Sequence, residues 1–149
     1  MKHFIHAVAG AIAMTLIVIF WTSTLISEVA LSLTVVAAVK QFIVYGLFIL
    51  VPCLAITGGS GVALSQPGAR GMVKRKKKRM AFAAINGLVL MIPLAVFLNI
   101  KAGRGEFDMV FYTAQVAELS VGIIQLVLLG LNFRDGMRMR KARLARSRA

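Results

Sequence analysis

The chain has 149 residues, of which 59% are hydrophobic and only 15% are charged, whereas a soluble domain carries about 25% charged residues. Its 18 Lys and Arg outnumber its 5 Asp and Glu, giving a net charge of +13 at a mean hydropathy of +0.84. These values exclude an ordinary soluble domain, disfavour a soluble nucleic-acid-binding protein, and indicate a membrane protein. The single cysteine excludes an intrachain disulfide and any CxxC metal or redox motif.

Four stretches are long and apolar enough to cross a hydrocarbon core, which takes about 20 residues of helix. They cover approximately residues 4–27, 34–57, 80–100 and 109–133. Helices are predicted because a backbone in lipid must satisfy its own hydrogen bonds and these runs show no alternation. Short connections favour an all-α, up-down-up-down four-helix bundle. Residues 1–133 would form this transmembrane domain and residues 134–149 a basic cytoplasmic tail.

Trp21 and its polar neighbours near the end of the first stretch are interpreted as an interfacial aromatic belt. Lys40 follows about six residues inside the outer end of the second stretch, with Gln41 beside it and Tyr45 one turn later. The Lys40 ammonium can snorkel outward or pair with an acid. Two acids remain open as partners, Glu28 in the preceding connection and Glu118 deeper in the bundle.

The third stretch follows a basic cluster and contains Asn86 next to Gly87, a pair suited to close helix packing. Pro52 in the second stretch and Pro93 in the third are expected to kink their helices, because proline lacks a backbone donor. The basic cluster is predicted to bind anionic lipid headgroups, at about 1 kcal/mol per charge near the surface. Its residues are Lys74, Arg75, Lys76, Lys77, Lys78 and Arg79.

Glu118 lies in the fourth stretch, about 13 Å below its outer end. A charge at such a depth costs at least about 2.5 kcal/mol unless it is paired or hydrated. Helical spacing places it on one face with Gln115, Gly122, Gln125 and Asn132. We expect this face to point into the bundle. It serves either interhelical hydrogen bonding around a close-approach glycine or a proton or cofactor site.

Basic residues are concentrated in the second connection and after the fourth stretch, with seven Lys or Arg in each place. Lys and Arg are retained on the cytoplasmic side of a membrane. The sequence therefore predicts that both termini and the second connection are cytoplasmic. Charges in the other two connections nearly balance, as is common outside.

His3 and His6 are the only histidines, and they lie one turn apart at the cytoplasmic mouth of the first stretch. A haem b would need His6 as its metal ligand, with Met80 or Met72 opposite or with His6 of a second subunit. Arg79 and the neighbouring lysines would then meet the propionates. The alternative is that both histidines are simply interfacial. No zinc site or Ser-His-Asp arrangement can be assembled, so no catalytic residue is predicted.

Several segments carry a resemblance that covers nearly the whole chain: HFIHAVAG, FWTSTLISE, KQFIVYGL, KRMAFAAINGLVLMIP, FDMVFYTAQVAELSVG and LNFRDGM. In these segments the chain resembles small, uncharacterised four-helix proteins of the bacterial inner membrane, which implies a location and a fold but no activity. In layout alone it is similar to four-helix membrane cytochromes of the haem b type. It departs from them in lacking histidines on a second helix.

Together these features predict a non-enzymatic protein of the bacterial inner membrane that serves as an accessory or assembly subunit of a larger membrane complex. Self-association is the other partner expectation, through small-residue faces such as Ala7, Gly10 and Ala13. A haem b or quinone-binding electron carrier is the first alternative, with His6 and the Glu118 face as its site. A proton-coupled transporter using Glu118 is the second, although no broken-helix inverted repeat is visible.

Overall fold

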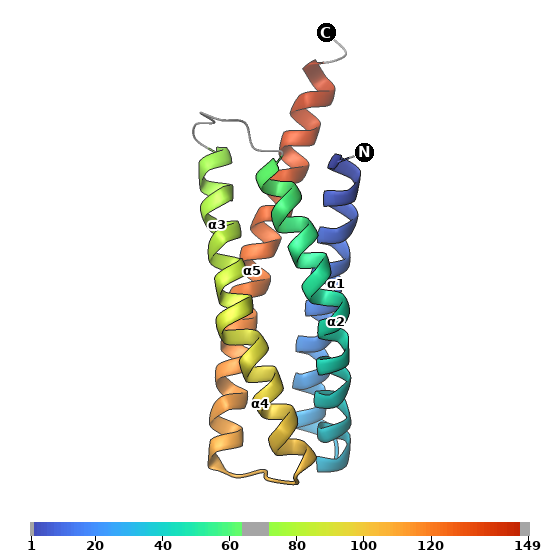
Figure 1. The fold of residues 1–149 in the computed structure, drawn as a ribbon, viewed down its shortest axis with the longest axis vertical. Coiled ribbons are helices and arrows are strands. Elements are labelled where there is room, and N and C mark those ends of the chain that lie inside the picture. The colour runs from blue at the N-terminus through green and yellow to red at the C-terminus, as the bar shows by residue number, and fades with distance from the viewer. Residues whose placement is uncertain (1, 64–71, 147–149) are drawn as a thin grey trace.

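The computed structural model describes residues 2–63 and 72–146, with the side chains of residues 4–61 and 78–138. Every element in that part of the chain is helical (Figure 1). The elements are α1 (Lys2–Ala30), α2 (Leu33–Ala63), α3 (Met72–Asn86), the π-helical turn η1 (Gly87–Met91), α4 (Ile92–Gly103) and α5 (Met109–Arg146). Because α3, η1 and α4 follow one another without a gap, they form one long helix.

Four helical segments among the described residues are long and apolar enough to cross a membrane. They are Phe4–Ala30, Leu33–Gly61, Lys78–Gly103 and Met109–Arg138. The all-α fold with four apolar spans is therefore confirmed. The backbone of α5 continues through position 133, so the predicted boundary between domain and tail falls within a helix.

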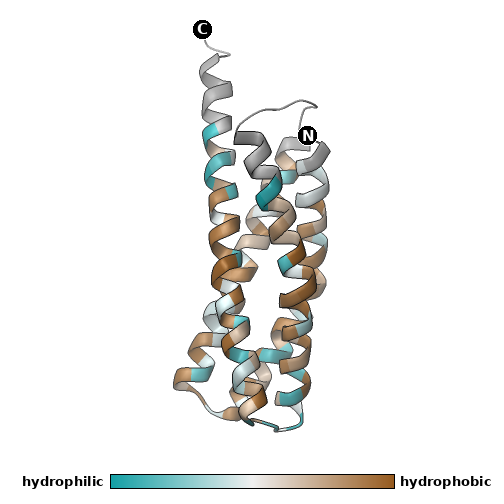
Figure 2. Cartoon of the chain, turned by 90° about the vertical axis from the view of Figure 1, so that its left-hand side faces the viewer, coloured by the Kyte–Doolittle hydropathy of each residue, from teal (hydrophilic) through white to brown (hydrophobic). Residues whose placement is uncertain are grey.

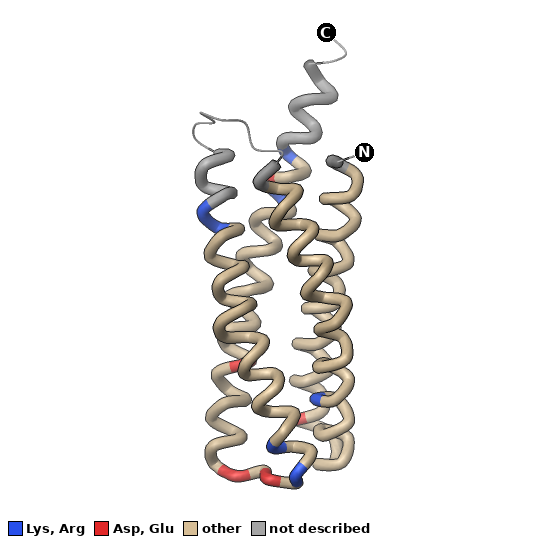
Figure 3. The backbone as a smooth tube through the Cα atoms, in the orientation of Figure 1, with Lys and Arg blue, Asp and Glu red and all other residues tan. Residues whose placement is uncertain are grey.

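The four segments lie side by side along the long axis of the molecule (Figures 1 and 2). α1 packs along α2 and also contacts α5, while α3 and α4 both contact α5. α2 contacts α3 towards one end of the bundle and α4 towards the other (Figure 1). Most charged residues lie towards the two ends of the bundle, and a few lie inside it, among them the buried Lys40 and Glu118 (Figure 3). Such a distribution suits a bundle whose middle lies in hydrocarbon.

Two apolar clusters hold the helices together. The larger cluster joins α1, α2 and α4 and contains Ala13, Ile17, Phe20, Ile43, Leu50 and Ala95. The smaller contains Val36, Leu98, Ala102 and Phe111, close to the short connections at 31–32 and 104–108. Part of the face predicted for self-association is used within the chain, because Ala13 is buried and Gly10 lies against Thr57 of α2.

Two glycines allow close helix approach. A Cβ atom at Gly46 of α2 would overlap the ring of Phe20, and one at Gly122 of α5 would lie 2.7 Å from Trp21 Cδ1. Both aromatic rings belong to α1. Small residues let backbones approach closely in membrane bundles, where helix packing is a main source of stability. The two glycines therefore fix where α1 meets its neighbours.

The π-helical turn interrupts the third span directly before Pro93. The Ile92 N–H donates to the Gly87 carbonyl five residues earlier, and Pro93 is the second residue of α4. Proline cannot donate the next backbone hydrogen bond, so the wider turn accommodates it. By contrast, α2 continues as an α-helix through Pro52.

The connection between α4 and α5 is held by charged groups. Lys101 Nζ donates to Glu106 Oε2 at 3.0 Å and to Asp108 Oδ2 at 2.9 Å. Asp108 Oδ1 also accepts the Phe111 N–H at 2.9 Å, which caps the start of α5. Gly105, at φ 72°, allows the chain to reverse here. The Asp108 carboxylate thus both holds Lys101 at the end of α4 and caps the start of α5.

The Lys101 ammonium, and secondarily the Phe111 N–H, lower the pKa of Asp108 below its usual value. The ionised carboxylate therefore contributes stability that is fully present above the unfolded pKa of about 3.9 and is lost as the pH falls through the lower folded value. In thermal unfolding in detergent, Asp108→Asn should flatten this acid dependence while keeping a capping oxygen. Asp108→Ala should lower the melting temperature further at neutral pH. Equal acid dependence of the native protein and Asp108→Asn would contradict this assignment.

Candidate functional site

An ion pair lies inside the bundle between α2 and α5. Lys40 Nζ donates to Glu118 Oε2 at 2.6 Å, and the two residues are only 1% and 6% exposed. Among the described residues the backbones of α2 and α5 do not pack against each other. The pair therefore joins helices that lie diagonally across the bundle. In hydrocarbon neither charge has water as an alternative partner, so each depends on the other.

Gln115 and Glu28 surround this pair. Gln115 Nε2 donates to Glu118 Oε2 at 3.3 Å, while Gln115 Oε1 and Glu28 Oε1 are buried and have no hydrogen-bond partner among the described residues. Glu28 also lies within electrostatic range of Lys40 and Glu118. The ion pair thus has a second carboxyl and an amide as its polar neighbours.

The polar residues predicted on α5 lie together inside the bundle, whereas those predicted on α2 are divided between its inside and its outer surface. Gln115, Glu118, Gln125 and Asn132 are all buried on one side of α5. Of the two acids considered for Lys40, Glu118 makes the hydrogen bond. Gln41 and Tyr45 lie on the outer surface of α2, and Tyr45 is 64% exposed. A helix places residues adjacent in sequence about 100° apart, which is why Gln41 does not follow Lys40 inward.

A second polar contact joins α3 to α5. Asn86 Nδ2 donates to Gln125 Oε1 at 2.9 Å, and Gln125 Nε2 donates to the Ala83 carbonyl at 3.2 Å. Both side chains are buried. Each such interhelical hydrogen bond contributes on the order of 1 kcal/mol.

The residues considered for haem binding make other contacts. His6 Nδ1 lies 3.1 Å from the Thr57 carbonyl oxygen and 2.9 Å from Ser60 Oγ, both on α2. Gly61 packs between the side chains of His6 and Met80, so the space beside the imidazole is filled. Arg79 forms an ion pair with Asp135. Haem binding by His6, with Met80, Met72 or His6 of a second subunit opposite, stays a prediction that these contacts do not test.

The predicted lipid-binding cluster lies only partly within the described side chains. Lys78 is exposed, and Arg79 is half-buried against Asp135 of α5. The side chains of Lys74, Arg75, Lys76 and Lys77, and that of Met72, lie outside the described set.

Trp21 lies inside the bundle, which corrects its interpretation as an interfacial anchor. Its Nε1–H donates to the Leu119 carbonyl at 3.0 Å, and its ring packs over Gly122 of α5. It lies nine residues before the end of α1, about 13 Å from that end. The signal available in the sequence was Gly122, which leaves room on the polar face of α5 for a large ring from another helix.

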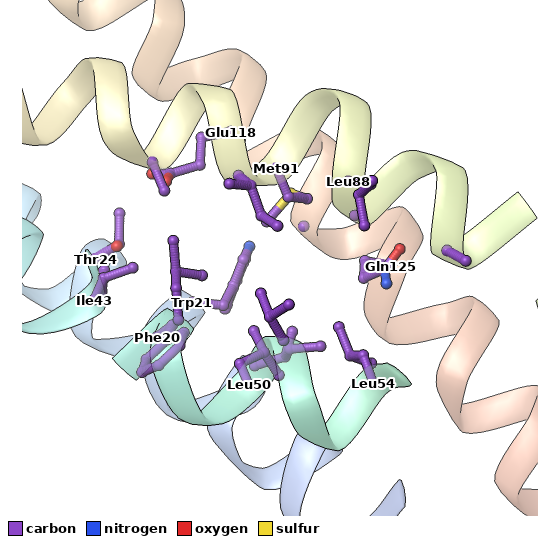
Figure 4. Close-up of a pocket in the computed structure, with 18 of the residues that line it drawn as sticks. Phe20, Trp21, Thr24, Ile43, Leu50, Leu54, Leu88, Met91, Glu118 and Gln125 are labelled. Atoms are coloured by element: carbon purple, nitrogen blue, oxygen red, sulfur yellow. The ribbon is translucent and has the colours of Figure 1, made fainter. Parts of the chain in front are cut away.

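A cavity of about 260 Å³ lies between the helices, next to the ion pair. All four spans contribute to its lining (Figure 4). Most of the wall is aliphatic or aromatic, from residues such as Ile17, Phe20, Ile43, Leu50 and Leu54. Four residues bring polar groups to it, namely Trp21, Thr24, Glu118 and Gln125. Neither His6, Met80 nor Arg79 belongs to this lining.

The chain matches no protein-family model, no curated protein sequence and no solved structure.

Lys40→Met should cost about 3 kcal/mol of unfolding free energy, because it leaves Glu118 without its charged partner. The double change Lys40→Met, Glu118→Gln removes both charges and should be less destabilising than Lys40→Met alone. Unfolding by sodium dodecyl sulfate in mixed micelles, followed by circular dichroism, measures Lys40→Met, Glu118→Gln and the double variant. A double variant that loses the sum of the two single losses would rule out this coupling.

Proposed function

We propose that this chain is a non-enzymatic, multi-pass protein of the bacterial inner membrane that acts as an accessory or assembly subunit of a larger membrane complex. Among the described residues, the connections outside the helices are only 31–32 and 104–108. These two connections offer little surface outside the membrane on which a substrate could be enclosed. The short connections between the helices therefore best support a role in which the chain acts by binding other membrane proteins.

The proposed topology is up-down-up-down, with both termini and the second connection in the cytoplasm. The charge distribution supports it, because Lys78, Arg79, Arg134 and Arg138 belong to the ends of the third and fourth spans that adjoin the basic segments. Lys and Arg are retained on the cytoplasmic side. The same basic segments would bind anionic lipid headgroups on that side.

Single-cysteine labelling tests this topology, starting from a Cys53→Ala background that removes the one native cysteine. A membrane-impermeant maleimide added to intact spheroplasts should label Ser32→Cys but label Arg138→Cys only after permeabilisation. Both positions are exposed in the structure, so accessibility to the reagent depends on the side of the membrane. The reverse labelling pattern would overturn the orientation.

The observation that carries the partner proposal is the exposure of Gln41 and Tyr45 on one face of α2. Measured from Leu33, they lie about 12 Å and 18 Å into the span. A side chain exposed at that depth faces hydrocarbon, where an amide or hydroxyl without a partner is costly. A transmembrane helix of a partner protein can supply hydrogen bonds that the described part of the chain does not give to these two side chains. Exposed Phe42 and Phe48 flank them with large apolar contact surfaces.

Co-purification in mild detergent tests this proposal. The tagged native chain should elute with a stoichiometric membrane partner, and Gln41→Leu, Tyr45→Phe should release that partner because it removes both polar groups. The double change makes a lipid-facing surface more apolar, so the chain itself should remain folded. The matched control is Thr113→Val, Ser120→Ala on the exposed face of α5, where each hydroxyl bonds its own helix.

Two outcomes would contradict the accessory role. One is elution of the native chain alone. The other is recovery of differently tagged copies as the sole assembly, which would show a homo-oligomer instead of a larger complex.

A further inference from the structure

The cavity reaches the lipid-facing surface of the bundle. Four of its lining residues are exposed, Val51 and Ala55 on α2 and Ala84 and Leu88 on α3 and η1. Among the described residues, η1 does not contact α2, although the α3 and α4 segments on either side of it do. The opening therefore lies between α2 and η1, where an apolar molecule can enter from the bilayer.

The volume sets the size of the molecule that fits. An apolar protein cavity of about 150 Å³ stays dry and takes up benzene. The present cavity, at about 260 Å³, has room for one six-membered ring with several small substituents. Phe20, Trp21 and Met91 offer the aromatic and thioether surfaces on which such a ring packs well.

Polar groups lie at both ends of this space. Glu118 and Thr24 lie towards one end and Gln125 towards the other, with Trp21 and Met91 between them (Figure 4). Glu118 and Gln125 are two helical turns apart on α5, about 10 Å along its axis. A carboxylate accepts hydrogen bonds, whereas an amide nitrogen donates two, and Gln125 donates only one to another described residue. The ends are therefore complementary to oxygen atoms on opposite sides of a ring.

We propose that this cavity binds the ring of a membrane-dissolved quinol or quinone, whose apolar tail leaves between α2 and η1. At one end, a quinol hydroxyl would donate to the Glu118 carboxylate, whereas a quinone carbonyl would accept from the Thr24 hydroxyl. The opposite ring oxygen would accept a hydrogen bond from the second N–H of Gln125. The ring itself would lie against Trp21. The small side chains of Ala55 and Ala84 leave room at the opening for the tail.

Trp21 reports on this site directly, because it is the only tryptophan in the chain. The experiment uses the full chain in quinone-free phosphatidylcholine nanodiscs, titrated with decylubiquinone or decylubiquinol. Quenching of Trp21 fluorescence should saturate. In the control Trp21→Phe, Phe48→Trp, the tryptophan lies on the lipid-facing surface of α2 and should show only the linear quenching of a quinone dissolved in lipid.

Closing the opening supplies the second arm. Ala55→Phe and Ala84→Phe approach it from opposite sides, and each should raise the dissociation constant by about tenfold or more. Ala81→Phe, an exposed position on α3 outside the lining, should leave it unchanged. Thermal unfolding shows whether each variant is folded. If a variant does not fold, the titration of the native chain still tests the site.

Competition identifies the chemistry of the ligand. Dodecylbenzene, a ring without oxygens, should bind about tenfold more weakly than decylubiquinone, because it lacks the hydrogen bonds at both ends. Linear quenching in the native chain, equal to that of the control, would overturn the site. Displacement of decylubiquinol by an equal concentration of dioleoylglycerol would overturn the ring assignment in favour of a hydroxyl-bearing lipid.

Discussion

In the hydrocarbon interior, an ammonium and a carboxylate can be charged together only if they meet. Lys40 of α2 and Glu118 of α5 meet across the diagonal of the bundle, at a distance of 2.6 Å and almost without exposure. No backbone contact joins these two helices in the described chain, so the ion pair sets their relative rotation and depth. Once these are set, Gln115, Gln125 and Asn132 must also face inward, since they share one side of α5. The buried polar face follows from one constraint.

The diagonal pair also bears on why the bundle is hollow. Glu118 lies at one end of the cavity, and the hydrogen bond between Asn86 and Gln125 lies near the other. Between these two contacts the helices are held apart at a spacing that apolar side chains alone do not fill. Trp21 spans part of the gap and is itself anchored by its hydrogen bond to the Leu119 carbonyl. Polar contacts between helices can thus keep an apolar cavity open. Closing the cavity would require breaking these contacts in hydrocarbon, which offers no other hydrogen-bond partner.

The sequence predicted the architecture well and the interior poorly. Hydropathy alone located the four spans, because about 20 apolar residues per crossing is a strong requirement. Helical periodicity also predicted the buried face of α5, including Glu118 and Gln125. The choice of Glu118 over Glu28 as the partner of Lys40 was beyond reach, since it depends on how far apart two non-adjacent helices lie. The inward position of Trp21 was missed for a related reason: depth along one helix does not reveal which neighbour has a glycine opposite.

The π-helical turn has a consequence for the register of the third span. Ala83, before the turn, and Ala102, after it, are both buried. In an uninterrupted α-helix these two positions would be about 100° apart around the axis, so one of them would face lipid. The turn absorbs one additional residue and brings both onto the same side. The span can therefore be viewed as two phased halves joined by a one-residue insertion. Loss of any single residue between Gly87 and Met91 would convert the turn into ordinary α-helix and keep Leu98 and Ala102 on the core side, whereas straightening the turn without such a loss would rotate both out of the core.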